Sequence, residues 1–179
     1  MPPGRSSEEG RGTTGGFSDE AHFEDFYKRT APALRGYIMR ISGSAFAADD
    51  VLQTAYVRLL NAPAMDDAQR KSYLYKTATN CVIDEWRKRS REEKRFPEQH
   101  YEEGHSKDPS ISIEMERALA QLSPQSRALL WLAYVDGYDH DEIAEILQLS
   151  PKSVRVLLFR ARGKVKDMLG PEGKAVVRT

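Results

Sequence analysis

Apolar side chains recur at steps of three and four residues along much of this chain, which is the spacing of one face of an α-helix. Over 18–42 this pattern predicts a helix with Ser18 as a candidate cap and with Pro32 kinking or dividing it. Another apolar face covers 51–60 and predicts a further helix. Breaker residues then predict a polar loop over 61–71.

The next predicted helix, over 72–91, carries two different faces. Its apolar face holds Leu74, Ala78, Cys81, Val82 and Glu85. The other face holds Tyr73, Lys76, Asn80, Asp84 and Arg87, and it leads into a run of basic residues. An aromatic ring, a cation and an amide on one exposed stripe can stack a nucleic-acid base and hold its backbone.

The second half of the chain has the pattern of a helix-turn-helix unit. After a short helix over 111–122, Ser123-Pro124 is a helix start that the serine hydroxyl caps. Asp139 and Glu142 form a candidate capping box, and a turn covers 148–150. A long basic helix follows, and we expect its core face to hold Val154, Leu158, Ala161 and Val165. The predicted fold class is therefore all-α, with two small helical domains joined by a flexible linker. The predicted division is a disordered tail (1–17), a first domain (18–91), an acidic linker (92–110), a second domain (111–170) and a tail (171–179).

Charge is segregated along the chain, although the formal net charge is zero. Residues 86–95 hold six basic and two acidic side chains, and residues 151–166 hold six basic and no acidic ones. Residues 96–116 hold six acidic side chains and one basic one. Two positive segments thus flank a negative one, and a polyanion responds to such local fields rather than to the net charge.

Several classes of protein are disfavoured by the sequence. No apolar run approaches the ~20 residues that span a bilayer, and the N-terminal segment lacks the apolar stretch of a secretory signal. The only cysteine, Cys81, cannot form an internal disulfide and suits a reducing cytoplasm. The four histidines lack metal-ligand spacing, so we expect no metal site, and no cofactor motif is present.

Three blocks stand in order along the chain: ADDVLQTAYVRLL at 48–60, YLYKTATNCVIDEWRKRSR at 73–91, and 119–169, which contains DEIAEILQLSPKSVRVLLFRAR. They resemble regions 2.2, 2.3–2.4 and 4 of the extracytoplasmic-function (group 4) sigma factors of the sigma-70 family. No region 3 domain lies between them. The resemblance implies a non-catalytic, cytoplasmic, DNA-binding subunit of bacterial RNA polymerase that recognises the −35 and −10 promoter elements and helps to open DNA for transcription initiation.

The resemblance also implies partners and sites. By this resemblance, Asp49, Asp50 and Gln53 are expected to bind core polymerase at the β′ clamp coiled coil, and Leu52 is expected to add an apolar contact. Region 4 would also meet the β flap. The loop at 61–71 matches a specificity loop that takes a flipped base, and the acidic linker matches a segment threaded toward the polymerase active site. An anti-sigma protein is a further expected partner.

Contacts with DNA are expected on two helices. The residues expected to contact the −10 element are Tyr73, Lys76, Asn80, Arg87, Lys88 and Arg91. Those expected to contact the −35 element are Lys152, Ser153, Arg155, Val156, Phe159, Arg160 and Arg162. Trp86 lies off the −10 stripe, so we expect it to pack in the core. The chain departs from the family at Thr54, where an acidic residue is usual, and at Val156-Leu157, where a small polar and then a basic residue are usual.

Two other readings remain open at this stage. A conventional helix-turn-helix regulator would use residues 20–91 for sensing or dimerisation and would bind duplex operators without polymerase. A nuclease could use carboxylates such as Asp49, Asp50, Asp139 and Glu142, but these residues stand at helix-start positions and no catalytic motif surrounds them.

Overall fold

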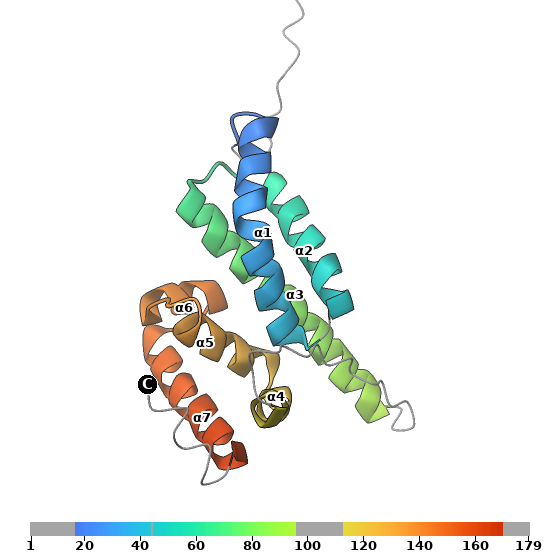
Figure 1. Ribbon diagram of the computed structural model, residues 1–179, viewed down its shortest axis with the longest axis vertical. Helices are drawn as coiled ribbons and strands as arrows, with labels where there is room; N and C mark the ends of the chain where they lie inside the picture. The colour runs from blue at the N-terminus through green and yellow to red at the C-terminus, as the bar shows by residue number, and fades with distance from the viewer. Residues whose placement is uncertain (1–16, 44, 96–112, 170–179) are drawn as a thin grey trace, which may run out of the picture.

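The computed structural model describes residues 17–43, 45–95 and 113–169, and every regular element in these ranges is an α-helix (Figure 1). The helices are α1 (Glu20–Ser42), α2 (Ala45–Leu60), α3 (Asp67–Arg95), α4 (Ile113–Ala120), α5 (Pro124–Tyr134), α6 (His140–Leu147) and α7 (Pro151–Leu169). The predicted all-α fold is confirmed. The tails, most of the acidic linker, His100 and His105 lie outside the described residues.

Helix α1 is capped one residue later than expected and is not divided. Asp19, rather than Ser18, accepts the backbone N–H of His22 at 2.7 Å. Pro32 lies within one continuous helix. The helix ends at Gly43, whose φ of 75° is left-handed and whose N–H donates to the Met39 carbonyl at 2.9 Å.

Helix α3 begins five residues before the expected start at residue 72, so the polar loop is shorter than predicted. The cause is a capping box that we overlooked in the sequence. The Asp66 carboxylate accepts from the Gln69 backbone N–H, and the Gln69 side chain accepts from the Asp66 N–H. At its other end α3 extends to Arg95, so residues 92–95 belong to this helix and not to the linker.

Helices α1, α2 and α3 form the first unit around an apolar core (Figure 1). Its largest fully buried side chains include Phe26, Leu34, Tyr37, Ile38, Ile41, Leu59 and Leu74. The Tyr37 hydroxyl shares a hydrogen bond of 2.5 Å with the Thr79 hydroxyl, which satisfies both buried groups. Phe17, which we assigned to the disordered tail, is buried against Phe26 and lies 4.2 Å beneath the Arg70 guanidinium.

Helices α4 to α7 form the second unit, with the caps that the sequence predicts. Ser123 caps α5, and Asp139 and Glu142 form the capping box of α6. Helix α7 buries Val154, Leu158, Ala161 and Val165, which is the predicted core face. Val165 packs with Ala118 and Leu122, and this small cluster holds α4 against α7.

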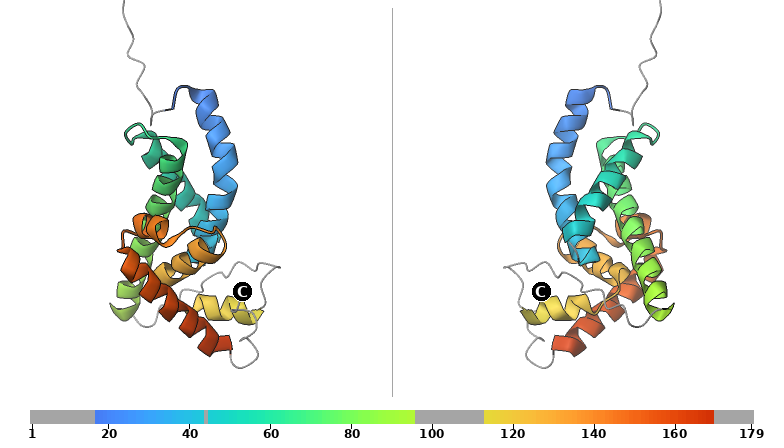
Figure 2. Two further views of the ribbon diagram at one scale, coloured as in Figure 1. Left: turned by 90° about the vertical axis from the view of Figure 1, so that its left-hand side faces the viewer. Right: turned by 90° about the vertical axis from the view of Figure 1, so that its right-hand side faces the viewer.

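The two units pack against each other. Helix α5 contacts α1 and α3, and helix α6 contacts α3 (Figures 1 and 2). Buried residues of both units belong to one continuous apolar cluster. None of the helices in the described ranges is long and apolar enough to cross a bilayer.

Candidate nucleic-acid and polymerase interfaces

The outward face of α7 carries both charge and apolar surface. Lys152, Arg155, Arg160 and Arg162 are all exposed. Among them stand two exposed apolar side chains, Phe159 at 71% and Val156 at 48%. A basic helix surface with apolar groups suits the major groove of DNA, where phosphates flank base edges and thymine methyl groups.

Two of the predicted −35 residues already have partners within the protein. Ser153 belongs to the cap of α7, because its N–H donates to the Ser150 hydroxyl and the two hydroxyls lie 2.7 Å apart. Arg162 donates to the Tyr134 hydroxyl at 3.1 Å. Their contribution to an interface is therefore partly to hold α7 and its side chains in place.

The predicted −10 stripe on α3 is less exposed than expected at its N-terminal end. Tyr73 is half-buried and packs against the core, and Lys76 and Asn80 are also half-buried. Asn80 donates from Nδ2 to the Gln148 Oε1 at 3.3 Å, across the boundary between the two units. Burial extends over more of α3 than one face because α5 and α6 cover a second side of it.

The C-terminal part of the same stripe is open to solvent. Arg87, Lys88 and Arg91 are exposed, and Arg87 lies 3.6 Å from Asp84. No residue of α3 from 83 to 92 is fully buried, and Figure 1 shows the helix continuing past α1 and α2. For the same reason our expectation for Trp86 was wrong. This side chain is 39% exposed and is not part of the core.

The predicted polymerase face on α2 is polar and exposed, with one exception. Asp49, Asp50 and Gln53 are exposed. Two hydrogen bonds from Arg35, at 2.6 and 3.1 Å, hold Asp49, and these bonds lower the pKa of its carboxyl. Leu52 is only 7% exposed and belongs to the core, so little of its side chain is available for the apolar contact expected from it.

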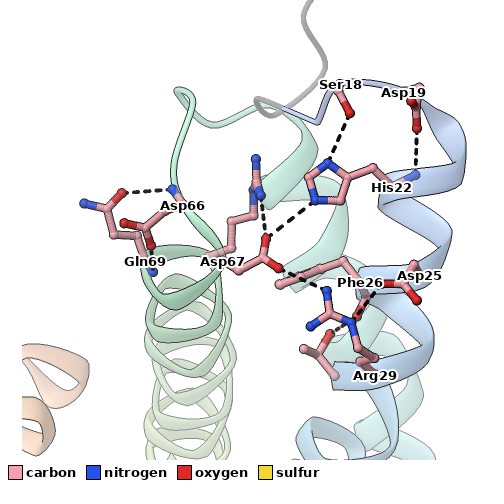
Figure 3. A network of polar contacts seen from close by, with 11 residues as sticks. Ser18, Asp19, His22, Asp25, Phe26, Arg29, Asp66, Asp67 and Gln69 are labelled. Carbon is pink, nitrogen blue, oxygen red and sulfur yellow. Dashed lines mark hydrogen bonds and ion pairs between the residues drawn. The ribbon is translucent and has the colours of Figure 1, made fainter.

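A polar network that sequence reasoning missed fixes the loop between α2 and α3 to the start of α1 (Figure 3). Asp67, the first residue of α3, accepts from Arg29 at 3.0 Å and from Arg70 at 2.6 Å, and it lies 3.7 Å from His22 Nε2. The hydrogen bond from Arg29 is the largest cause that lowers the pKa of Asp67. The Asp-x-x-Gln spacing at residue 66 was the available signal for the end of this loop.

The thiol of Cys81 and a possible metal site are two further features that could support chemistry. Half-buried Cys81 has a thiol pKa that burial raises, which makes the thiolate less available. Within these same ranges no three His, Cys, Asp or Glu side chains are grouped as metal ligands.

Comparisons with known proteins identify the two units. The family model "Sigma-70 region 2" matches residues 26–92, and "Sigma-70, region 4" matches residues 112–165. Both units, in this order on one chain, define a sigma-70 type protein. The chain belongs to the extracytoplasmic-function sigma factors of the sigma-70 family, which bind core RNA polymerase and promoter DNA as regulatory subunits of the polymerase.

Individual relatives agree with this assignment. The chain is 27% identical over 157 residues to RNA polymerase sigma factor CarQ of Myxococcus xanthus, covering 83% of this chain and 89% of CarQ. It is 29% identical over 159 residues to ECF RNA polymerase sigma factor SigL of Mycobacterium tuberculosis, covering 80% and 86%. Its fold matches sigma factor RpoE of Bartonella quintana, solved with the anti-sigma factor NepR, at a TM-score of 0.69 and 21% identity, covering 84% and 98%.

Proposed function

We propose that this sigma factor divides promoter recognition between α3, which reads the −10 element, and α7, which reads the −35 element. The observation that carries the proposal is the exposed face of α7, which is both basic and apolar. In the other unit, the C-terminal part of α3 also carries exposed basic side chains. The functional domains would be residues 18–91 and 111–170. Asp49, Asp50 and Gln53 would dock on the β′ clamp coiled coil, and region 4 would meet the β flap.

The energetics of promoter opening agree with a subunit that has no catalytic activity of its own. Taking a base out of the duplex costs a few kcal/mol, and stacking it on an aromatic ring returns about 1–3 kcal/mol. Thermal opening followed by capture on α3 therefore needs no nucleotide hydrolysis and no cofactor. Because core polymerase is its partner, we place the protein in the cytoplasm.

An anti-sigma protein is a further proposed partner. The structurally similar RpoE was solved with the anti-sigma factor NepR, and CnrH, at a TM-score of 0.62 and 22% identity, was solved with the cytosolic domain of CnrY. Such a partner would cover the polymerase-binding and DNA-binding surfaces of this chain.

Runoff transcription tests the proposed function. Genome-wide pull-down of the protein with polymerase would first supply the promoter sequence. The purified chain and core polymerase are then expected to give runoff product from that promoter, while core polymerase alone gives none. Folded protein that yields no product from a verified promoter would refute the proposal. A helix-turn-helix regulator that acts without polymerase is the disfavoured alternative, and it would shift a duplex tightly by itself.

Asn80→Ala is expected to weaken holoenzyme binding to single-stranded −10 DNA by about fivefold, since one hydrogen bond contributes about 1 kcal/mol. Binding to core polymerase should not change, because Asn80 lies on α3 and the proposed polymerase face lies on α2. Fluorescence anisotropy with labelled oligonucleotide and a core-binding assay measure the two quantities. Equal losses in both would refute the role assigned to Asn80.

Phe159 and Val156 are expected to contact thymine methyl groups in the −35 element, since exposed apolar side chains on a basic recognition helix match that groove feature. Replacing a contacted thymine by uracil removes one methyl group and should weaken binding about three- to fivefold. In Phe159→Ala the thymine and uracil duplexes should bind alike at that position. Met168→Ala, at an exposed position near the end of α7, is the control and should keep the methyl preference. A persistent preference in Phe159→Ala would rule out contact by this ring.

A further inference from the structure

The loop between α2 and α3, residues 61–66, is anchored at both of its ends. At its start the Asn61 side chain donates to a carbonyl in the last turn of α2 at 2.7 Å. At its end Asp66 belongs to the capping box of α3. Between these anchors Pro63 and Ala64 are exposed. The conformation of this middle part therefore depends on how α2 and α3 are held relative to each other.

The N-terminal half of α1 holds the α2 side of the loop. The Thr30 and Tyr56 hydroxyls lie 2.6 Å apart and share a hydrogen bond between α1 and α2. The centre of the Tyr56 ring also lies 4.7 Å from that of Tyr27 and 6.2 Å from that of Phe23. Because Tyr56 stands four residues before the end of α2, these contacts fix the part of α2 from which the loop departs.

The same half of α1 holds the α3 side of the loop through Asp67. Arg29 donates from Nη2 to the Asp67 carboxylate at 3.0 Å (Figure 3). Its Nε donates to Asp25, one turn earlier on α1, at 2.9 Å, and this second bond orients the guanidinium. The hydrogen bond to Asp67 is also the largest cause that raises the pKa of Arg29. Arg29 therefore keeps its charge, and the pair joins α1 to the start of α3.

A buried arginine constrains Asp67 from its other side. Arg70 is only 4% exposed and donates to Asp67 at 2.6 Å, and its guanidinium lies 4.2 Å from the centre of the buried Phe17 ring. An exposed ion pair by itself contributes little to stability, whereas removing the partner of a buried charge is costly. Asp67 serves both arginines at once, so its place beside the loop is fixed more firmly than the exposed pair with Arg29 could fix it.

The loop also lies beside the surface proposed for the −10 element. Asp66 precedes Tyr73 by seven residues, which corresponds to about 10 Å along an α-helix. A single strand that runs along α3 from Asn80 toward Tyr73 would meet the 61–66 loop next. An ordered loop binds such a strand more tightly than a flexible one, because less conformational entropy is lost on binding.

We propose that Arg29 and Asp67 are positioning residues for promoter recognition, which hold the 61–66 loop in the conformation that receives one base of the −10 strand. The step that involves DNA rests on the proposed function, whereas the ordering of the loop does not. Neither residue touches the strand: Arg29 acts through Asp67, and Asp67 acts through the loop. Base capture therefore depends on α1, a helix to which the proposed function gives no role.

Hydrogen exchange of the lone chain, followed by mass spectrometry, tests the positioning without DNA. Arg29→Ala should speed exchange of the backbone amides of residues 61–71 about two- to fivefold, as expected for the loss of one exposed ion pair. Exchange in the second unit should not change. Lys28→Ala is the matched control, because it removes an exposed cation that lies 2.6 Å from Glu24 on its own helix, and it should leave residues 61–71 unchanged. Equal exchange in Arg29→Ala and the parent overturns the proposal.

A double-mutant cycle tests whether Arg29 acts through Asp67. Arg29→Lys keeps the cation and should retain most of the protection from exchange. Asp67→Ala removes the acceptor of two arginines, so its effect should exceed that of Arg29→Ala. Adding Arg29→Ala to Asp67→Ala should then cause little further change. Additive effects of the two substitutions would show that Arg29 acts independently, against the proposal.

Single-stranded −10 oligonucleotides that each lack one base test the functional consequence in the holoenzyme. With the parent chain, removing the base that the loop receives should weaken binding about fivefold or more, as expected for one stacked base. In Arg29→Ala this penalty should fall about two- to fivefold at that position alone, and the position should differ from the one whose penalty is lost in Asn80→Ala. Lys28→Ala should keep every penalty of the parent.

The outcomes separate this proposal from the proposed function. Penalties that Arg29→Ala leaves unchanged, or lowers equally at every base, overturn the claim that Arg29 positions the loop for base capture. A parent chain that shows no penalty at any base, together with the expected exchange results, counts against the proposed function alone and supports the ordering of the loop by α1.

Discussion

Arg127→Ala is expected to lower the free energy of unfolding by about 2–4 kcal/mol, because it leaves three carbonyl groups, two buried and one partly buried, without their charged donor. Urea denaturation followed by circular dichroism measures the change. One of the three carbonyls, that of Ile41, belongs to α1, so the substitution removes a hydrogen bond between the two units as well as two within the second unit.

Two further variants test whether the loss of stability comes from the hydrogen bonds of Arg127. Arg127→Lys keeps the charge but cannot present the planar group that reaches three acceptors, so an intermediate loss is expected. Arg117→Ala removes an exposed arginine of α4 and should change stability by no more than about 0.5 kcal/mol. If Arg127→Ala and Arg117→Ala were equally stable, the hydrogen bonds of Arg127 would carry no net stabilisation.

Arg155→Ala is expected to weaken holoenzyme binding to the −35 element by about 5- to 150-fold, which corresponds to about 1–3 kcal/mol for one good contact with a base edge. Arg155 is exposed near the N-terminal end of α7, the end of a recognition helix that contacts base edges. Competition among duplexes with single base changes should show that discrimination is lost at one position.

Arg160→Ala provides the comparison for Arg155. We expect Arg160 to hold a phosphate, so its loss should weaken all duplexes alike and reduce the salt dependence of binding by about one ion. The opposite result would be a loss of base discrimination in Arg160→Ala and an equal loss of affinity for all duplexes in Arg155→Ala. That result would assign the base contact to Arg160 and the phosphate contact to Arg155.

Helix caps and the buried face of α7 could be predicted from the sequence, because each depends on residues close together in the chain. The caps at Ser123 and Asp139 were found because side-chain acceptors at fixed spacing satisfy the first N–H groups of a helix. The buried face of α7 followed from its period. The start of α3 was missed only because the equally regular capping box at Asp66 and Gln69 was overlooked.

Long-range packing explains what the sequence could not predict. The spacing of apolar residues along a helix does not reveal where the neighbouring helices end. Trp86 was therefore assigned to the core, although it is 39% exposed and α3 extends past α1 and α2. Leu52 shares a helix with exposed acidic residues, and its burial depends on how α2 meets the other helices. The contact from Asn80 to Gln148 joins residues 68 positions apart, and no local pattern encodes it.

Footprinting on a promoter identified by pull-down tests the central claim most directly, namely that two DNA-reading helices on one chain act together only on the polymerase. With core polymerase, the chain should protect two duplex segments about 25 base pairs apart, and the −10 segment should become reactive to probes of single-stranded bases. The chain alone should protect neither segment at the same concentration. Full protection by the chain alone, or protection of a single operator, would contradict the account.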